Sequence, residues 1–183
     1  MMFVWIDLET TGLNPDSDEI VEVAWFCSDN WEWFSFPQSC LVTPTKQGWE
    51  LLKQQPVNQM HTDSGLIADL ATKDTLLIED VEDQILEDIE KYAKEYDVKD
   101  IILAGSSVHF DRGFIATEMQ RLDQRLSYRH FDVSTLRLFF DGLGYAELSE
   151  RKTPSKHRAK HDIVDSYKLA RKYVEWVNNH AEC

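Results

Sequence analysis

The feature that most constrains the fold is an apolar stretch near the N-terminus that runs into two acidic residues. Residues 3–8 read Phe-Val-Trp-Ile-Asp-Leu, and Glu9 is followed by Thr-Thr-Gly. An apolar run that ends at a glycine-containing turn predicts a buried strand. Alternate residues of a strand point to the same face, so Asp7 and Glu9 project together from its end. The chain must therefore form a sheet that delivers two carboxylates to one place.

Two neighbouring carboxylates repel each other, and each raises the pKa of the other unless a positive charge lies between them. A divalent cation that prefers oxygen ligands, such as Mg²⁺ or Mn²⁺, removes this repulsion. The alternative is an acidic surface turn, because 33 of the 183 residues are Asp or Glu. Further acidic ligands elsewhere in the chain would distinguish a metal site from such a turn.

The composition predicts a single globular domain over residues 1–183. No apolar run is long enough to cross a membrane, and residues 3–6 are too few for a signal peptide. Three cysteines without zinc-type spacing indicate free thiols, so we expect a cytoplasmic protein or one in a similar reducing compartment. The net charge of −14 predicts that most of the surface would repel a long nucleic acid, but it allows a short piece to bind at a local site.

Hydrophobic periodicity predicts an α/β domain that begins with three or four antiparallel strands and continues with helices and two further strands. After the N-terminal strand, we expect strands over 19–27, 31–36, 40–43, 100–105 and 129–133. Helices are expected over 49–55, 65–72, 79–96, 111–122, 134–141 and 160–178. A loop is expected between the last two helices.

Two later acidic residues can complete the metal site. Asp111 follows a predicted strand and a Gly-Ser-Ser turn, and Asp162 lies in the first turn of the last predicted helix. Each could instead simply cap its helix. With Asp7 and Glu9, however, they make four carboxylates that can hold two divalent cations for in-line displacement at phosphorus. His157 lies in the preceding loop, where it can accept the proton of the attacking water.

The pattern Asp7-x-Glu9-Thr-x-Gly, then Asp111, then His157-x₄-Asp162, resembles the signature of the histidine-type DEDD 3′→5′ exonucleases. Beyond this signature, the chain resembles the oligoribonuclease family along almost its whole length. The matching stretches are residues 4–13, 61–66, 104–112, 128–135 and 157–163. The resemblance implies an RNase H-like fold, with a mixed sheet of about five strands flanked by helices, and a homodimer.

The resemblance also implies an activity: metal-dependent hydrolysis of short single-stranded RNA, down to dinucleotides, from the 3′ end to 5′-mononucleotides. Two Mg²⁺ or Mn²⁺ ions would serve as cofactors, and Leu13 would wedge against the bases. The residues implied to hold the terminal phosphate are His61, Ser107, Arg129 and Ser134, and Tyr128 and Arg129 would reach in from the partner subunit. Such a phosphate cap favours the shortest substrates and needs only a few local cations.

Two positions depart from the family pattern. Ser106 stands where asparagine is usual, and residues 56–60 lack a tryptophan that stacks on a base, a contact that Trp49 could supply. Two other functions stay open: an exonuclease that acts on longer RNA or DNA, and an inactive exonuclease fold used as a binding module. His161 and Asp165 form a second candidate pair on the last helix, but register with the family assigns them to the solvent-facing surface.

Overall fold

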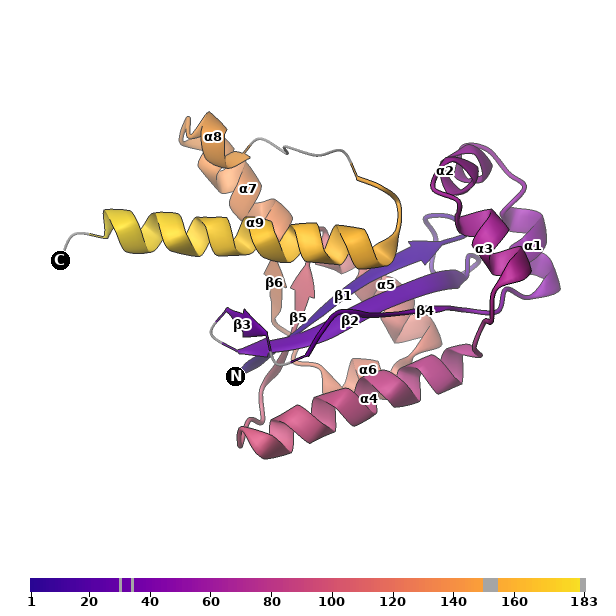
Figure 1. Ribbon diagram of the computed structural model, residues 1–183, viewed down its shortest axis with the longest axis horizontal. Helices are drawn as coiled ribbons and strands as arrows, with labels where there is room; N and C mark the ends of the chain where they lie inside the picture. Colours follow the sequence, from indigo (N-terminus) through magenta and orange to yellow (C-terminus); the bar gives the residue numbers. More distant parts are fainter. Residues whose placement is uncertain (30, 34, 150–154, 182–183) are drawn as a thin grey trace.

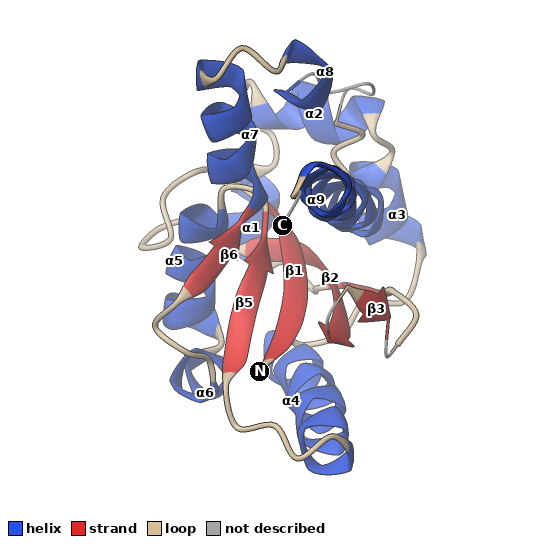
Figure 2. Ribbon diagram, turned by 90° about the vertical axis from the view of Figure 1, so that its left-hand side faces the viewer, coloured by secondary structure: helices blue, strands red, loops and turns tan. Residues whose placement is uncertain are grey.

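The computed structural model describes residues 1–29, 31–33, 35–149 and 155–181. Its centre is a sheet with the strand order β3-β2-β1-β5-β6, in which β4 also pairs with β2 (Figures 1 and 2). The strands are β1 (Met2–Thr10), β2 (Ile20–Asp29), β3 (Glu32–Trp33), β4 (Gln38–Leu41), β5 (Ile101–Gly105) and β6 (His130–Asp132). β1 pairs antiparallel with β2 and parallel with β5, so the sheet is mixed, as the resemblance implies.

Helices cover both faces of this sheet. They are α1 (Lys46–Leu51), α2 (Val57–Asp63), α3 (Leu66–Thr72), α4 (Ile78–Glu95), α5 (Val108–Glu118), α6 (Gln120–Arg125), α7 (Val133–Gly142), α8 (Ala146–Ser149) and α9 (Ala159–His180). The long helices α4 and α9 lie on opposite faces, and α1 to α3 gather beyond the end of β1 (Figure 1). None of the described helices is both long and apolar enough to span a membrane.

The alternation of side chains along β1 divides the core into two clusters. The even-numbered residues from Met2 to Leu8 are buried against residues of α4, α5 and α6. Phe3 and Trp5 are buried on the other face, against residues of α7 and α9. Asp7 and Glu9 continue this odd-numbered series, because alternate residues of a strand share a face. The two carboxylates therefore project toward the side of the sheet that α9 covers.

Several elements differ from the expectations. The strand expected over 31–36 contains only Glu32–Trp33 within the described residues. The helix expected over 49–55 is found as α1 over Lys46–Leu51, and Pro56, expected to end it, is the N-cap residue of α2, a helix that the sequence did not predict. The helix expected over 111–122 begins at Val108 and is divided at Met119, whose ψ of 61° is not helical. The expected loop contains α8, and its residues 150–154 lie outside the described residues.

Candidate metal and catalytic site

Three of the predicted carboxylates meet at the end of β1. One oxygen each from Asp7, Glu9 and Asp162 can be chosen so that all lie within 4.8 Å of one another. Asp111 approaches from α5, and its Oδ1 accepts a hydrogen bond from the backbone N–H of Leu8 at 3.1 Å. Among neighbouring charges, Asp111 contributes most to the raised pKa of Asp7. The fold therefore gathers Asp7, Glu9 and Asp162 into one group and holds Asp111 against the backbone of Leu8, the residue that follows Asp7.

Burial and mutual repulsion disfavour the ionised forms of these groups. Burial, followed by the charges of Asp111 and Glu9, holds the pKa of Asp7 well above its usual range. Burial and the nearby carboxylates raise the pKa of Glu9 to about 8, and burial raises that of Asp111 to about 8. A divalent cation would stabilise the ionised forms, and oxygen donors are the ligands that Mg²⁺ and Mn²⁺ prefer. The residues present therefore fit a divalent metal ion.

The raised pKa values predict that the metal-free protein loses stability as the pH rises. Carboxyl groups with a higher pKa in the folded state bind more protons when the protein is folded. Their full contribution to the free energy of unfolding is therefore present below the pKa that they have in the unfolded state. That contribution is lost as the pH rises through the folded value, which is about 8 for Glu9. We expect the free energy of unfolding in EDTA to fall by a few kcal/mol, on the order of 1.4 kcal/mol per unit of pKa shift, between pH 5 and 8.5. Urea denaturation at the two pH values measures this change.

A half-buried carboxyl outside the cluster provides the matched control. Burial raises the pKa of Glu118 to about 7, and its Oε1 accepts the backbone N–H of Ile20. Glu9→Gln and Glu118→Gln should each reduce the slope of stability against pH. Of these two contributions to the slope, only the contribution of Glu9 should also disappear when Mn²⁺ is added to the wild type. A flat or rising profile in EDTA would contradict the prediction.

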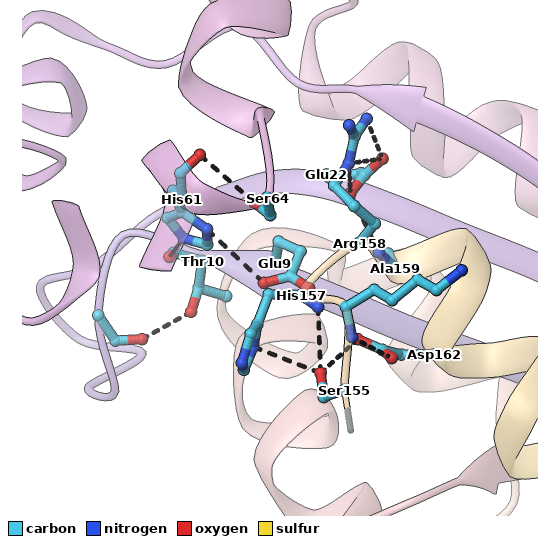
Figure 3. Close-up of polar contacts among 12 residues, drawn as sticks. Glu9, Thr10, Glu22, His61, Ser64, Ser155, His157, Arg158, Ala159 and Asp162 are labelled. Carbon is cyan, nitrogen blue, oxygen red and sulfur yellow. Dashed lines mark hydrogen bonds and ion pairs between the residues drawn. The ribbon is translucent and has the colours of Figure 1, made fainter. Parts of the chain in front are cut away.

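The residues before α9 hold Asp162 in place (Figure 3). Ser155 donates its hydroxyl to Asp162 Oδ2 at 2.7 Å, and the backbone N–H of Lys156 donates to Oδ1 at 3.2 Å. The backbone of His157 has a φ of 51°, in the left-handed region, and its N–H donates to Ser155 Oγ. The exposed imidazole of His157 has Nδ1 3.4 Å from the same Ser155 Oγ. A single tight loop thus orients both the histidine and the carboxylate.

His61 of α2 is placed below the surface. Its ring is fully buried, and Nε2 lies 2.8 Å from the carbonyl oxygen of Thr10. Since a carbonyl can only accept, Nε2 carries the proton in this contact. Nδ1 has no hydrogen-bond partner among the described residues and lies 3.8 Å from Glu9 Oε2. Burial lowers the pKa of His61. In this conformation, the ring supports the end of β1.

Ser107 and Ser134, both predicted to hold phosphate, come together at the start of α5. Their hydroxyl oxygens are 3.3 Å apart. Asp132 accepts hydrogen bonds from the backbone N–H groups of Ser107, Val108 and Ser134 at 2.8–3.1 Å, so its carboxylate is occupied in organising this turn. Ser107 is the N-cap residue of α5, and Asp111 lies in the first turn of the same helix. The two hydroxyls are therefore next to the element that carries Asp111.

The remaining predicted substrate residues lie at the surface. Leu13 is 82% exposed in the turn after β1, and Tyr128 is 79% exposed before β6. The guanidinium of Arg129 lies over the ring of Tyr128, 4.6 Å from its centroid. On α9, His161 is exposed, and Asp165 forms an ion pair with Lys168 at 3.3 Å. The group of three clustered carboxylates includes Asp162 and not Asp165.

Sequence reasoning missed residues that shape the site without belonging to its signature. Glu22 on β2 is directly opposite Glu9 and only 2% exposed, and it contacts Arg158 at the start of α9. Ser155 was also missed. An acidic residue within an otherwise apolar strand is the signal that could have drawn attention to Glu22, because a fully buried Glu needs a partner.

The family to which the chain belongs follows from comparison with known proteins. The model of the exonuclease family RNase_T matches residues 4–170. The chain therefore belongs to this exonuclease family. An oligoribonuclease of Streptomyces griseus is 36% identical over 95% of this chain and 85% of its own length. An oligoribonuclease of Corynebacterium efficiens is 37% identical over 89% of this chain and 73% of its own.

Solved structures show the same fold. Exonuclease I from Methylocaldum szegediense has a TM-score of 0.64 at 17% identity, over 98% of this chain and 41% of that protein. The zinc-bound form of the E. coli exonuclease I complex with single-stranded DNA also has a TM-score of 0.64, at 14% identity, over 98% of this chain and 43% of that protein. This chain spans less than half the length of these structures. The likeness establishes the RNase H-like fold of exonucleases.

Proposed function

We propose that this protein is an oligoribonuclease-type 3′→5′ exoribonuclease that hydrolyses short single-stranded RNA, down to dinucleotides, to 5′-mononucleotides. The observation that carries the proposal is the convergence of Asp7, Glu9 and Asp162 within 4.8 Å in a chain of the exonuclease family. We further propose that it works as one domain over residues 1–183, in the cytoplasm. An acidic protein with a local site suits a substrate that carries only one or two phosphates.

We assign two divalent cations, Mg²⁺ or Mn²⁺, to the carboxylates of Asp7, Glu9, Asp111 and Asp162. The oxygens of Asp7, Glu9 and Asp162 within 4.8 Å of one another, with Asp111 held next to the strand, support this assignment. When bound, such ions lower the pKa of the attacking water and stabilise the leaving oxygen. His157 then accepts the proton of the water. Because Ser155 lies against its Nδ1, we assign this role to Nε2.

The substrate's length is proposed to be set by contacts at both ends. Leu13 is exposed after the catalytic strand, where its side chain can pack against a base. The hydroxyls of Ser107 and Ser134 lie 3.3 Å apart at the start of α5, where both can donate hydrogen bonds to a phosphate oxygen. Arg129 adds a positive charge for charge-assisted hydrogen bonds to the same phosphate. The buried His61 supports β1, so a direct phosphate contact by this residue would require its ring to move.

A second copy of the chain is the partner that we propose. Exposed apolar side chains gather on α7 and in the turn that follows it, at Leu138, Phe139, Leu143 and Tyr145. Patches of this kind commonly mark protein interfaces. In a homodimer, the exposed Tyr128 and its neighbour Arg129 could act in the partner's site. Sedimentation velocity at micromolar concentration tests this arrangement, and a monomer would count against action in trans.

A substrate series tests the activity. The purified protein, with Mn²⁺ or Mg²⁺, is given end-labelled RNA dinucleotide, RNA heptamer and long single-stranded DNA in separate reactions. We expect the fastest turnover on the dinucleotide and the slowest on long DNA. The reverse order would favour an exonuclease for longer RNA or DNA. No turnover on any substrate would favour the inactive binding module.

A further inference from the structure

A buried ionic network lies directly behind the carboxylate cluster. Glu22 on β2 pairs in register with Glu9 on β1, and its side chain is almost completely buried. A buried carboxylate this close to other carboxylates requires compensation by a cation and by hydrogen-bond donors. Glu22 is not one of the three carboxylates that could share a metal ion. Its partner is instead a side chain from the start of α9.

Arg158 provides that compensation by pairing with Glu22 (Figure 3), and it also reaches a second element. Its Nε donates to both carboxylate oxygens of Glu22, at 3.2 and 3.3 Å, and Nη2 donates to Oε1 at 3.1 Å. Nη1 lies 2.8 Å from Oδ2 of Asp69 on α3. Glu22 also accepts the hydroxyl of Ser39 at 3.3 Å. The guanidinium therefore ties β2 and α3 to the segment that precedes α9.

The same network holds the first turn of α9. Glu22 Oε2 accepts the backbone N–H of Ala159, the first residue of the helix, at 3.0 Å. The backbone carbonyl of Arg158 accepts the N–H of Asp162 at 3.1 Å. Arg158 directly follows His157 in the chain. A continuous set of contacts thus runs from buried Glu22 through Arg158 to both Asp162 and His157.

We propose that Glu22, Arg158 and Asp69 form a positioning network for the exonuclease reaction, a role that rests on the proposed function. The network fixes the start of α9 against the sheet, so that Asp162 and His157 meet Asp7 and Glu9. Arg158 is a positioning residue, since its guanidinium is engaged by Glu22 and Asp69 rather than aimed at substrate.

The test compares Arg158→Met with Arg171→Met. Both arginines belong to the α9 segment, but Arg171 is half-exposed, and among the described residues its ion-pair partner is Glu175, one turn along the helix at 3.2 Å. Partners behind metal ligands typically contribute about 10- to 100-fold to metal affinity or activity. We expect Arg158→Met to weaken Mn²⁺ binding to the metal-free protein, measured by calorimetry, at least about tenfold and to lower kcat on the dinucleotide about 10- to 100-fold. The KM of Arg158→Met should stay within about twofold of the wild-type value. Arg171→Met should match the wild type in every measurement.

Two further variants keep the test decisive. Arg158→Lys retains the charge, but a single ammonium cannot reproduce the fork that joins Glu22 to Asp69, so we expect only partial recovery of Mn²⁺ affinity. Asp69→Asn removes the contact between Asp69 and Arg158 at a partly exposed position. This variant tests the positioning role if Arg158→Met does not fold. A lowered melting temperature with wild-type Mn²⁺ affinity and kcat in the folded variants would overturn the positioning role. A wild type that neither binds Mn²⁺ nor degrades RNA would overturn the proposed function instead.

Discussion

Asp7→Asn is expected to lower kcat on the RNA dinucleotide by about a thousandfold or more, while the protein stays folded. Asp7 belongs to the group formed with Glu9 and Asp162, so the amide would remove one of the carboxylates proposed to hold the metal ions. Stabilisation of transition-state charge by metal ions amounts to several kcal/mol, and each 1.4 kcal/mol is about tenfold in rate. Single-turnover kinetics at saturating Mn²⁺ would measure the loss.

The stability of the same variant should change in the opposite direction. Because burial and neighbouring carboxylates raise the pKa of Asp7, an amide that never ionises relieves repulsion in the metal-free protein. We therefore expect the melting temperature of Asp7→Asn in EDTA at pH 8 to equal or exceed that of the wild type. Asp165→Asn is the control, since that carboxyl lies outside the cluster and should keep near wild-type kcat. Equal losses in the two variants would contradict the assignment of the site.

His157→Ala is expected to lower kcat about 10²- to 10⁴-fold, the range usual for loss of a general base. The exposed imidazole lies in the tight loop that also orients Asp162, but it does not belong to the group of side chains that could share a metal ion. Affinity for Mn²⁺, measured by calorimetry, should therefore stay within about threefold of the wild type. Loss of catalysis without loss of metal binding would separate a proton acceptor from a ligand.

Two controls sharpen this prediction. His161→Ala alters an exposed histidine four residues further along, on the first turn of α9, and should keep near wild-type kcat. Added imidazole should recover part of the activity of His157→Ala, because a small base can occupy the space that the side chain leaves. An equal loss in His161→Ala, or Mn²⁺ affinity that falls with kcat in His157→Ala, would contradict the proposed role.

The sequence predicts those parts of the fold that local periodicity determines. The alternation of β1 indicates correctly that Asp7 and Glu9 share a face, because a strand's side-chain directions follow from its backbone alone. The long helices α4 and α9 are also predicted to within a few residues. The start of α2 after Pro56 and the break at Met119 were missed. Proline and an interrupted apolar stripe are each compatible with more than one local structure.

The network behind the site could not be predicted in the same way. Glu22 and Arg158 are 136 residues apart in the chain, and no spacing rule relates a strand residue to a helix-start residue at that distance. The side-chain environment of His61 is similarly a product of tertiary packing, since α2 places its ring against the Thr10 carbonyl. Sequence patterns indicate which side chains carry chemistry, whereas the contacts that orient them depend on how distant elements pack.

The carboxylate cluster combines residues of β1 with a residue at the start of α9, and this has a consequence for the synthesis of the protein. Asp7 and Glu9 emerge from the ribosome with the first strand, but Asp162 and Arg158 emerge only after most of the sheet has been translated. Until then the nascent chain lacks both the third carboxylate and the cation that compensates Glu22. Domains generally fold as units during translation, so the nuclease centre forms late, when α9 docks. We therefore expect a partly translated chain to lack nuclease activity.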